Sequence, residues 1–148
     1  MLYPEYQDIM SIIQMEKNRI PFYITYNDVF TRVKLHHHDF AELTIVTKGT
    51  GKEILNGKPC DLASGSVSFL LPNHMHEVIC DDPNNPLGLY CMMFDLHLLN
   101  HIPFGHEIGN LLLQTGKALP SHVQLDQPQH QKMLELYNEL NHEYTHDD

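Results

Sequence analysis

Short runs of alternating apolar and polar residues fill the middle of the chain, and residues that favour turns separate them. The runs are rich in β-branched and aromatic side chains, and an alternation with a period of two is typical of strands with one buried face. None of the gaps between the runs is long enough for a helix, which argues against a parallel α/β sheet. We therefore expect a mainly β fold, an antiparallel barrel or sandwich. The predicted strands cover residues 22–26, 29–35, 43–48, 52–55, 67–71, 77–79 and 87–96.

Turn residues mark the ends of several predicted strands. Asn56-Gly57 separates residues 52–55 from residues 58–62. This dipeptide is typical of a type I′ hairpin, because both of its residues need a positive φ angle. Asn27-Asp28 predicts a further turn, between the first two strands.

The two ends of the chain have a helical pattern. Residues 5–17 carry isoleucines near helical spacing, which predicts either a short helix or an extended arm. Towards the C-terminus we expect one short helix ending near Gly116 and a longer one over residues 129–144. We therefore divide the chain into an arm or helix (1–21), a β domain (22–106) and a helical segment (107–148).

The longer helix carries an apolar stripe that must be buried against a partner. That partner is either the β domain or a second copy of the chain, and the pattern leaves both alternatives open. The stripe consists of Met133, Leu136, Tyr137, Leu140 and Tyr144.

Composition and charge exclude several classes of protein. The 148 residues fit one domain, and 9 Lys+Arg against 19 Asp+Glu give a net charge of −10. Such a charge repels phosphate, so we expect no nucleic-acid binding by this chain alone. No stretch approaches the roughly 20 apolar residues that span a bilayer, so no membrane partner is expected. The three cysteines, Cys60, Cys80 and Cys91, lack CxxC spacing, which predicts free thiols and a protein of the reducing cytoplasm. We expect their side chains to pack as small apolar groups within the strands.

Candidate chemistry is concentrated around His36-His37-His38. Strand parity points His36, His38 and Glu42 to one side, together with Phe40, Thr44 and Val46, and turns His37 towards solvent. Two imidazoles and a carboxylate suit Zn, Ni, Mn or Fe. A fourth ligand could come from His74 or His76.

The spacing of these residues resembles that of the cupin superfamily. His36-x-His38-x3-Glu42-x6-Gly49 is similar to the first cupin motif, although Phe30 stands where that motif has a glycine. The second motif is matched by Gly65, five residues, Leu71-Pro72-Asn73, two residues and His76, with Leu71 and Asn73 replacing its proline and glycine. The resemblance implies a cupin-type double-stranded β-barrel, or jelly roll.

Within the superfamily, the sequence looks most similar to one branch. Residues 35–43, 45–51, 54–62 and 65–78 resemble the sensor domain of AraC-type transcription regulators. That family has an effector-binding barrel, a helical dimerisation segment and a DNA-binding domain with two helix-turn-helix units. Residues 119–148 contain a single Lys or Arg, Lys132, and no such units are found, so we expect an N-terminal piece that forms at most a weak homodimer.

The resemblance implies a non-enzymatic sensor that needs no cofactor and binds a small effector, for example a sugar. The expected effector site consists of Tyr23, Arg32, His36, His38, Glu42 and His76. The expected ligands of a divalent metal, if one binds, are His36, His38, Glu42 and His76.

Two other functions compete with this one. A small metal-dependent cupin enzyme, such as a dioxygenase or sugar isomerase, would use the same ligands, and a non-catalytic sugar-binding module would use the same barrel. Arg32 and Lys34 share strand parity with His36. They either orient a sugar or carboxylate effector or are exposed cations on an edge.

Overall fold

The computed structural model describes residues 4–8, 21–115 and 121–146. Two five-stranded sheets form its framework, with the strand orders β1-β3-β8-β5-β6 and β10-β7-β4-β9-β2. The strands are β1 (Glu5–Gln7), β2 (Phe22–Val29), β3 (Arg32–His38), β4 (Ala41–Lys48), β5 (Gly51–Leu55), β6 (Lys58–Leu62), β7 (Ser66–Leu70), β8 (His76–Cys80), β9 (Leu87–Phe94) and β10 (His122–Gln124).

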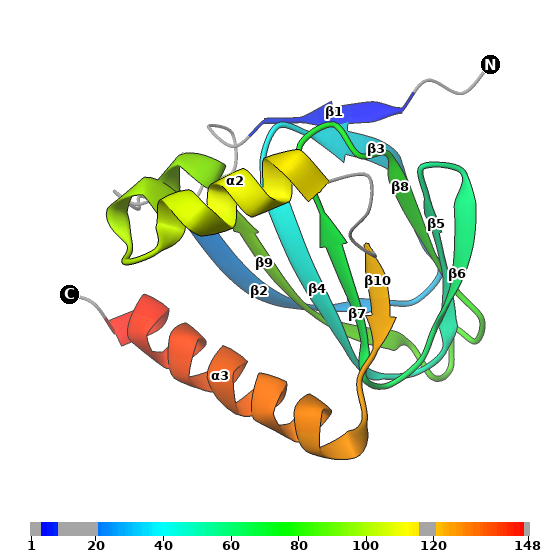
Figure 1. Cartoon of the computed structure of the whole chain (residues 1–148). Coiled ribbons are helices and arrows are strands. Elements are labelled where there is room, and N and C mark those ends of the chain that lie inside the picture. Colours follow the sequence, from blue (N-terminus) through cyan, green and yellow to red (C-terminus); the bar gives the residue numbers. More distant parts are fainter. Residues whose placement is uncertain (1–3, 9–20, 116–120, 147–148) are drawn as a thin grey trace.

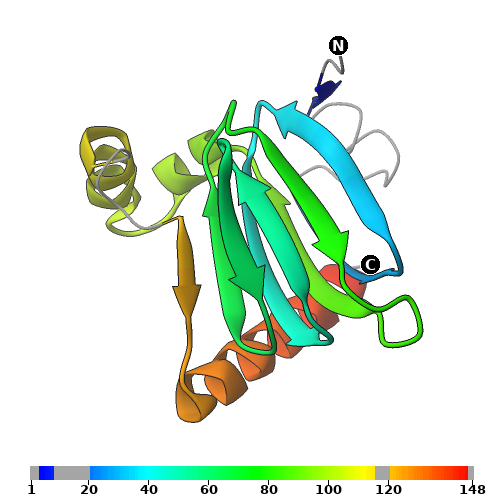
Figure 2. The same ribbon diagram turned by 90° about the vertical axis from the view of Figure 1, so that its right-hand side faces the viewer.

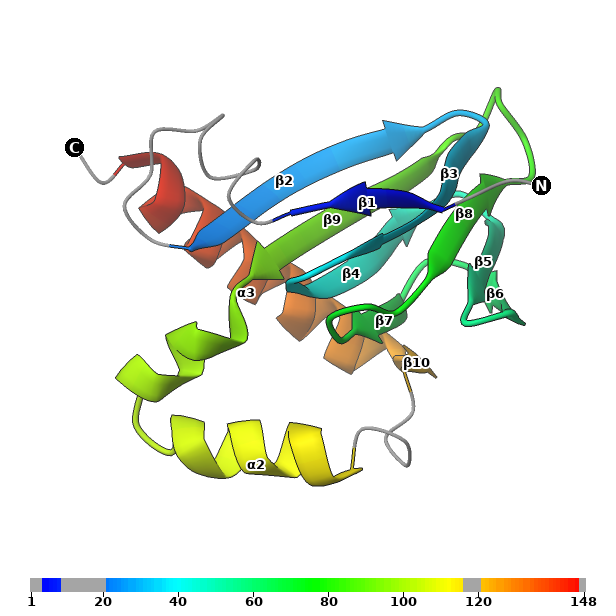
Figure 3. The same cartoon turned by 90° about the horizontal axis from the view of Figure 1, so that it is seen from above.

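The two sheets face each other as two layers (Figures 2 and 3). Their strand pairs are antiparallel, except that β1 runs parallel to β3. The space between the layers holds an apolar cluster to which both contribute: Val29, Val46, Leu62, Val78, Cys80, Leu87, Leu89 and Cys91. The predicted mainly β fold of the cupin type is confirmed. Cys80 and Cys91 fill the core as expected, whereas Cys60 is only half-buried.

The hairpin of β5 and β6 confirms the turn predicted from Asn56-Gly57. Both residues have positive φ angles, 49° at Asn56 and 80° at Gly57. Leu55 pairs with Lys58 directly across this two-residue loop. The chemistry of the turn therefore sets the register of the hairpin.

The turn predicted at Asn27-Asp28 is wrong. Strand β2 continues to Val29, because Asn27 pairs with Leu89 and Asp28 with Gly88 on β9. Asp28 also forms an ion pair with Lys48, with 3.0 Å between Oδ1 and Nζ. Pairing with β9 overrides the local preference of Asn and Asp for turns, and the chain reverses at residues 30–31 instead.

Three helical segments follow β9: η1 (Leu96–His101), α2 (Gly105–Thr115) and α3 (Gln127–His146). The two helices expected in residues 107–148 are present, but β10 lies between them and joins the edge of the second sheet next to β7. Helix α3 runs along the outer face of that sheet (Figure 1). No helix in the described residues is both long and apolar enough to cross a membrane.

Residue Tyr137 holds α3 against the sheet. Its side chain is 3% exposed and packs with Ile24, Ile45 and Val67. Its hydroxyl donates a hydrogen bond of 2.7 Å to the carbonyl oxygen of Leu43. The β domain is therefore one partner of the predicted stripe.

The stripe itself divides into two rows. Met133 and Tyr144 pack with Tyr137 against the sheet. Leu136 and Leu140 remain 46% and 38% exposed. One helix face touches a flat sheet only along a narrow line, so the leucines at its side stay in solvent.

At the other end of the chain, β1 supports the extended form of the predicted arm. Glu5 pairs with His36, and Gln7 pairs with His38. Residues 9–20, which include the isoleucines behind the helix alternative, lie outside the described residues.

Replacing Tyr137 by alanine should destabilise the chain by about 3 kcal/mol, because the change removes a buried ring and a hydrogen bond. Leu136→Ala on the same helix is the matched control and should cost less than about 1 kcal/mol, since Leu136 is half-exposed. Urea denaturation followed by circular dichroism measures both. Equal losses would mean that α3 does not pack on the sheet through Tyr137.

Candidate functional site

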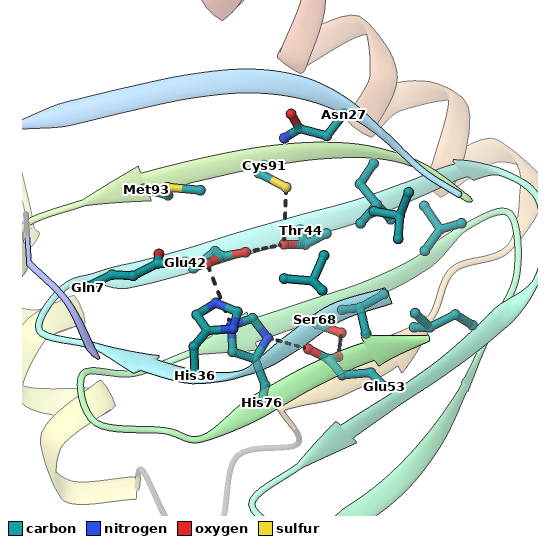
Figure 4. A pocket seen from close by; sticks show the side chains of 16 residues that line it. Gln7, Asn27, His36, Glu42, Thr44, Glu53, Ser68, His76, Cys91 and Met93 are labelled. Carbon is teal, nitrogen blue, oxygen red and sulfur yellow. Dashed lines mark hydrogen bonds and ion pairs between the residues drawn. The ribbon is translucent and has the colours of Figure 1, made fainter. Parts of the chain in front are cut away.

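A cavity of about 170 Å³ lies between the inner faces of the two sheets (Figure 4). One end is lined by polar side chains, His36, Glu42, Thr44, Glu53, Ser68 and His76. The other end is lined by apolar ones, Val29, Val33, Val46, Leu62, Val78 and Leu89. Gln7 of β1 also reaches the cavity, so the N-terminal arm forms part of its wall.

Strand parity places the predicted histidines and Glu42 inside the barrel. His36, His38 and Glu42 are 5%, 0% and 6% exposed. Thr44 and Val46 continue the row along β4 and line the cavity, as expected. His36, Glu42 and His76 each offer a ligating atom, and these atoms lie within 4.8 Å of one another.

His38 lies on the other side of Glu42 and does not line the cavity. Its Nε2 atom is 3.3 Å from a carboxylate oxygen of Glu42. Its ring stacks on Phe40 at a centroid distance of 4.1 Å. His38 is therefore a neighbour of Glu42 behind the cavity wall, and not one of the three residues that converge inside it.

Each of the three histidines is held through its Nδ1 atom. His36 Nδ1 is 2.8 Å from the carbonyl oxygen of Lys34, and His38 Nδ1 is 2.8 Å from that of Phe40. A carbonyl oxygen only accepts hydrogen bonds, so both Nδ1 atoms carry the proton and donate it. His76 Nδ1 donates in the same way to a carboxylate oxygen of Glu53, at 3.0 Å.

A neutral ring that is anchored in this way has no proton on Nε2. The Nε2 atom of His76 is buried and has no hydrogen-bond partner in the described part of the chain. Burial, together with the neighbouring His76 ring, lowers the pKa of His36, which favours its neutral form. The site therefore presents lone pairs that await a donor or a cation.

Glu42 adds a negative charge to these acceptors. Burial raises the pKa of its carboxyl group, but other effects, the hydrogen bond from His38 first among them, outweigh burial and hold the pKa at about 2. Thr44 donates a hydrogen bond of 2.9 Å to the same group. Glu42 is thus ionised at neutral pH.

Glu53 is a buried residue of the cavity that was not among the candidates predicted from the sequence. It is 2% exposed and lies on β5, opposite β4. Its carboxylate accepts hydrogen bonds from His76 and from the hydroxyl of Ser68 (Figure 4). The signal was present in the sequence, because Glu53 has the same strand parity as the apolar Leu55.

The prediction that Arg32 and Lys34 share a face with His36 is wrong. The register of β3 against β8 shifts between Val33 and His36, so Val33 and His36 both point inwards although they differ in parity. Arg32 and Lys34 are exposed. Arg32 forms an ion pair with Glu77, and the expected alternative of two exposed cations describes them correctly.

Three further candidates lie outside the cavity. Tyr23, expected in the effector site, contacts Tyr144 of α3 edge-on at a centroid distance of 6.4 Å and does not line the cavity. His37 faces away from Glu42 and contacts the ring of Tyr6 at 5.2 Å. Of the two candidates for a fourth ligand, His76 enters the cavity, whereas His74 accepts a hydrogen bond from the backbone N–H of Leu71.

A divalent metal fits the side chains that converge in the cavity. Two imidazoles and a carboxylate are a common ligand set for such ions. The hydrogen bonds at Nδ1 of His36 and His76 are the kind of support that metal-ligating histidines receive from outer groups. The same acceptors also suit the hydroxyl groups of a small organic molecule.

Comparison with known proteins gives one family. The family described as the AraC-like ligand binding domain matches residues 22–143. The HTH-type transcriptional activator RhaS of Escherichia fergusonii is 34% identical over 107 residues, which cover 71% of this chain and 36% of that protein. RhaS of Klebsiella pneumoniae is 30% identical over 95 residues, 64% of this chain and 30% of that protein. The chain thus spans about a third of the length of these relatives.

Two solved structures of cupin proteins resemble the chain distantly. A cupin 2 conserved barrel domain protein from Salinispora arenicola has a TM-score of 0.48 at 20% identity and covers 58% of this chain and 73% of that one. A cupin protein from Bacteroides fragilis has a TM-score of 0.42 at 18% identity, with 50% and 64% covered. At these scores the likeness adds nothing to the fold and site described above.

Removing Glu53 should be costly, because His76 and Ser68 would lose a buried partner together. We expect Glu53→Ala to destabilise the chain by about 3 kcal/mol. Glu77→Ala on the adjacent strand is the control and should cost less than about 1 kcal/mol, since its partner Arg32 is half-exposed. Denaturant titration of both variants checks this, and a small effect of Glu53→Ala would contradict the arrangement described.

Proposed function

The chain belongs to the family of AraC-like ligand-binding domains, and we propose that it is the effector-sensing domain of a transcription regulator. The cavity between the sheets is the observation that carries this proposal, because it combines buried, unpartnered acceptors with an apolar wall. Its volume of about 170 Å³ is below the roughly 300–1,000 Å³ of pockets for drug-sized ligands. The effector is therefore a small molecule.

The acceptors in the cavity indicate the chemistry of the effector. His76 Nε2 has no donor among the described residues, and the ionised Glu42 can accept hydrogen bonds beyond the one from Thr44, so the hydroxyl groups of a ligand suit both. The valines and leucines at the other end suit the C–H faces of the same molecule. A neutral sugar or polyol has both features.

A carboxylate effector fits less well. Glu42 and Glu53 are both buried at the polar end, and a third carboxylate would be repelled by them. Arg32, one of two cations that were candidates for orienting a sugar or carboxylate effector, lies outside the cavity in an ion pair with Glu77. The geometry thus supports a sugar over a sugar acid.

Effector binding would act on the rest of the protein through the walls of the cavity. β1 contributes Gln7 to one wall, and the sheet that carries Glu42 and Thr44 holds α3 on its outer face. A ligand shifts such a system only as far as its affinity differs between two states. In the whole protein, we place DNA binding in a separate domain, dimer contacts beside the exposed Leu136 and Leu140, and the site of action in the cytoplasm.

A panel of aldopentoses, aldohexoses and the corresponding aldonic acids tests the ligand class. Neutral sugars that bind should raise the melting temperature, by the equivalent of about 2.7 kcal/mol at a hundredfold excess over Kd. Glu42→Gln should weaken that binding about tenfold, since a hydrogen bond to a charged group contributes about 1.5–3 kcal/mol.

The control for this panel is Glu77→Gln, which changes a carboxylate outside the cavity and should leave sugar affinity unchanged. Binding of the aldonic acids in preference to the neutral sugars would overturn the proposed ligand class. Equal effects of both variants would place the sugar site outside the cavity.

A metal-dependent cupin enzyme is the second candidate function, and one specific observation favours it. The ligating atoms of His36, Glu42 and His76 already lie within 4.8 Å of one another. These three residues would hold a divalent ion, which supplies a Lewis acid when bound. Glu53 would orient His76 through its Nδ1 proton. The relatives are transcriptional activators, which supports the sensor over the enzyme.

Metal analysis of protein purified without a nickel resin separates these two functions. If a metal belongs to the cavity, His76→Ala should lose the metal found in the native protein, because His76 supplies one of its converging ligands. His37→Ala should retain it, because His37 faces away from the site. Loss of metal from both variants would contradict the assignment of these ligands.

A further inference from the structure

The last two turns of α3 carry two exposed histidines four residues apart, His142 and His146. Their rings lie on one face of the helix, with centroids 4.3 Å apart and planes inclined by 35°. Residues at i and i+4 of an α-helix are neighbours, and two histidines at this spacing are a familiar pair of zinc ligands. The pair lies far along the chain from the cavity residues and on the opposite side of the sheet.

His146 is already oriented for ligation. Its Nδ1 atom lies 2.9 Å from the carbonyl oxygen of His142 and 2.9 Å from the hydroxyl oxygen of Thr145. Since the carbonyl only accepts, Nδ1 carries the proton and the neutral ring keeps a lone pair on Nε2. Thr145 is itself held by donating a hydrogen bond of 2.8 Å to the carbonyl oxygen of Asn141.

The charges around the pair favour a cation. The C-terminal end of a helix carries a partial negative charge from its unpaired carbonyl groups. Glu139 and Glu143 are exposed on the same two turns. Within residues 121–146, the Lys or Arg nearest to the pair is Lys132, which lies ten residues before His142 in the sequence.

From this arrangement we infer that His142 and His146 form a surface site for a divalent transition metal ion, separate from the cavity. Imidazole is a preferred ligand of zinc, copper and nickel. The two rings bind the ion through one nitrogen each, and water completes its coordination. Both histidines and Glu143 are exposed, so the site lacks the dry, shaped pocket that metal-assisted hydrolysis requires.

Metal binding at this site stabilises the packing of α3. Tyr144 lies between the two histidines and faces the other way, with Phe22 and Tyr23 of β2 at centroid distances of 5.7 and 6.4 Å. Helix ends fray, and an ion that joins two successive turns opposes fraying. The site therefore holds the last turn, and with it the contact of Tyr144, against the sheet whose inner face lines the cavity.

The test is a calorimetric titration of the tag-free chain with Zn²⁺. His142→Ala/His146→Ala should lose one zinc-binding event that the native chain shows. The matched control is His97→Ala/His101→Ala, a pair with the same spacing in η1. η1 is a 3₁₀-helix with three residues per turn, so its residues at i and i+4 do not share a face, and this variant should keep the event.

Hydrogen exchange gives a second readout that does not depend on counting sites. Zinc should slow the exchange of backbone amides in residues 140–146 of the native chain and of the control. It should leave them unchanged in the His142→Ala/His146→Ala variant. An unchanged number of zinc ions bound to that variant, or zinc protection that persists in it, would overturn the proposal.

Discussion

Three hydrogen bonds hold the histidines of the site through the Nδ1 atoms of His36, His38 and His76, and those of His36 and His76 decide what the cavity can bind. Each one fixes a proton on Nδ1, and in a neutral His36 or His76 ring this leaves a lone pair on Nε2. Two of the acceptors are backbone carbonyls two residues away, so the neighbouring backbone orients His36 and His38. The third is the buried Glu53, on another strand, so the orientation of His76 depends on the pairing of β5 with β8.

This polar cluster is costly to bury, and the rest of the molecule offsets that cost. Glu42 and Glu53 are almost inaccessible, and an isolated carboxylate in such a place would be strongly disfavoured. Their hydrogen bonds to Thr44, Ser68 and His76 reduce the penalty, and the apolar clusters on both faces of the second sheet supply stability. A buried polar cluster with unpartnered acceptors is weak evidence for stability and stronger evidence for a binding site.

Much of the fold and the centre of the site could be predicted from the sequence, because alternation determines which side chains face inwards along a regular strand. Alternation correctly placed the side chains along β4 from Glu42 to Val46. The turn preference of Asn-Gly correctly predicted the hairpin at Asn56-Gly57. It failed at Arg32 and Lys34, because a shift in register within β3 depends on pairing with β8, which no local pattern reveals. Glu53 was missed for a related reason, since its partner His76 is 23 residues away.

Nitrogen NMR of the histidine rings tests the central claim most directly, because it distinguishes a protonated from an unprotonated ring nitrogen. With uniformly ¹⁵N-labelled protein at neutral pH and without metal or sugar, long-range ¹⁵N–¹H correlations should show the Nδ1-protonated neutral form for His36 and His76, the two histidines that line the cavity. Replacing each histidine in turn assigns its signals. Signals from rings protonated at Nε2, or from fully protonated rings, would contradict the account, because the acceptors on which the proposed binding depends would then not exist.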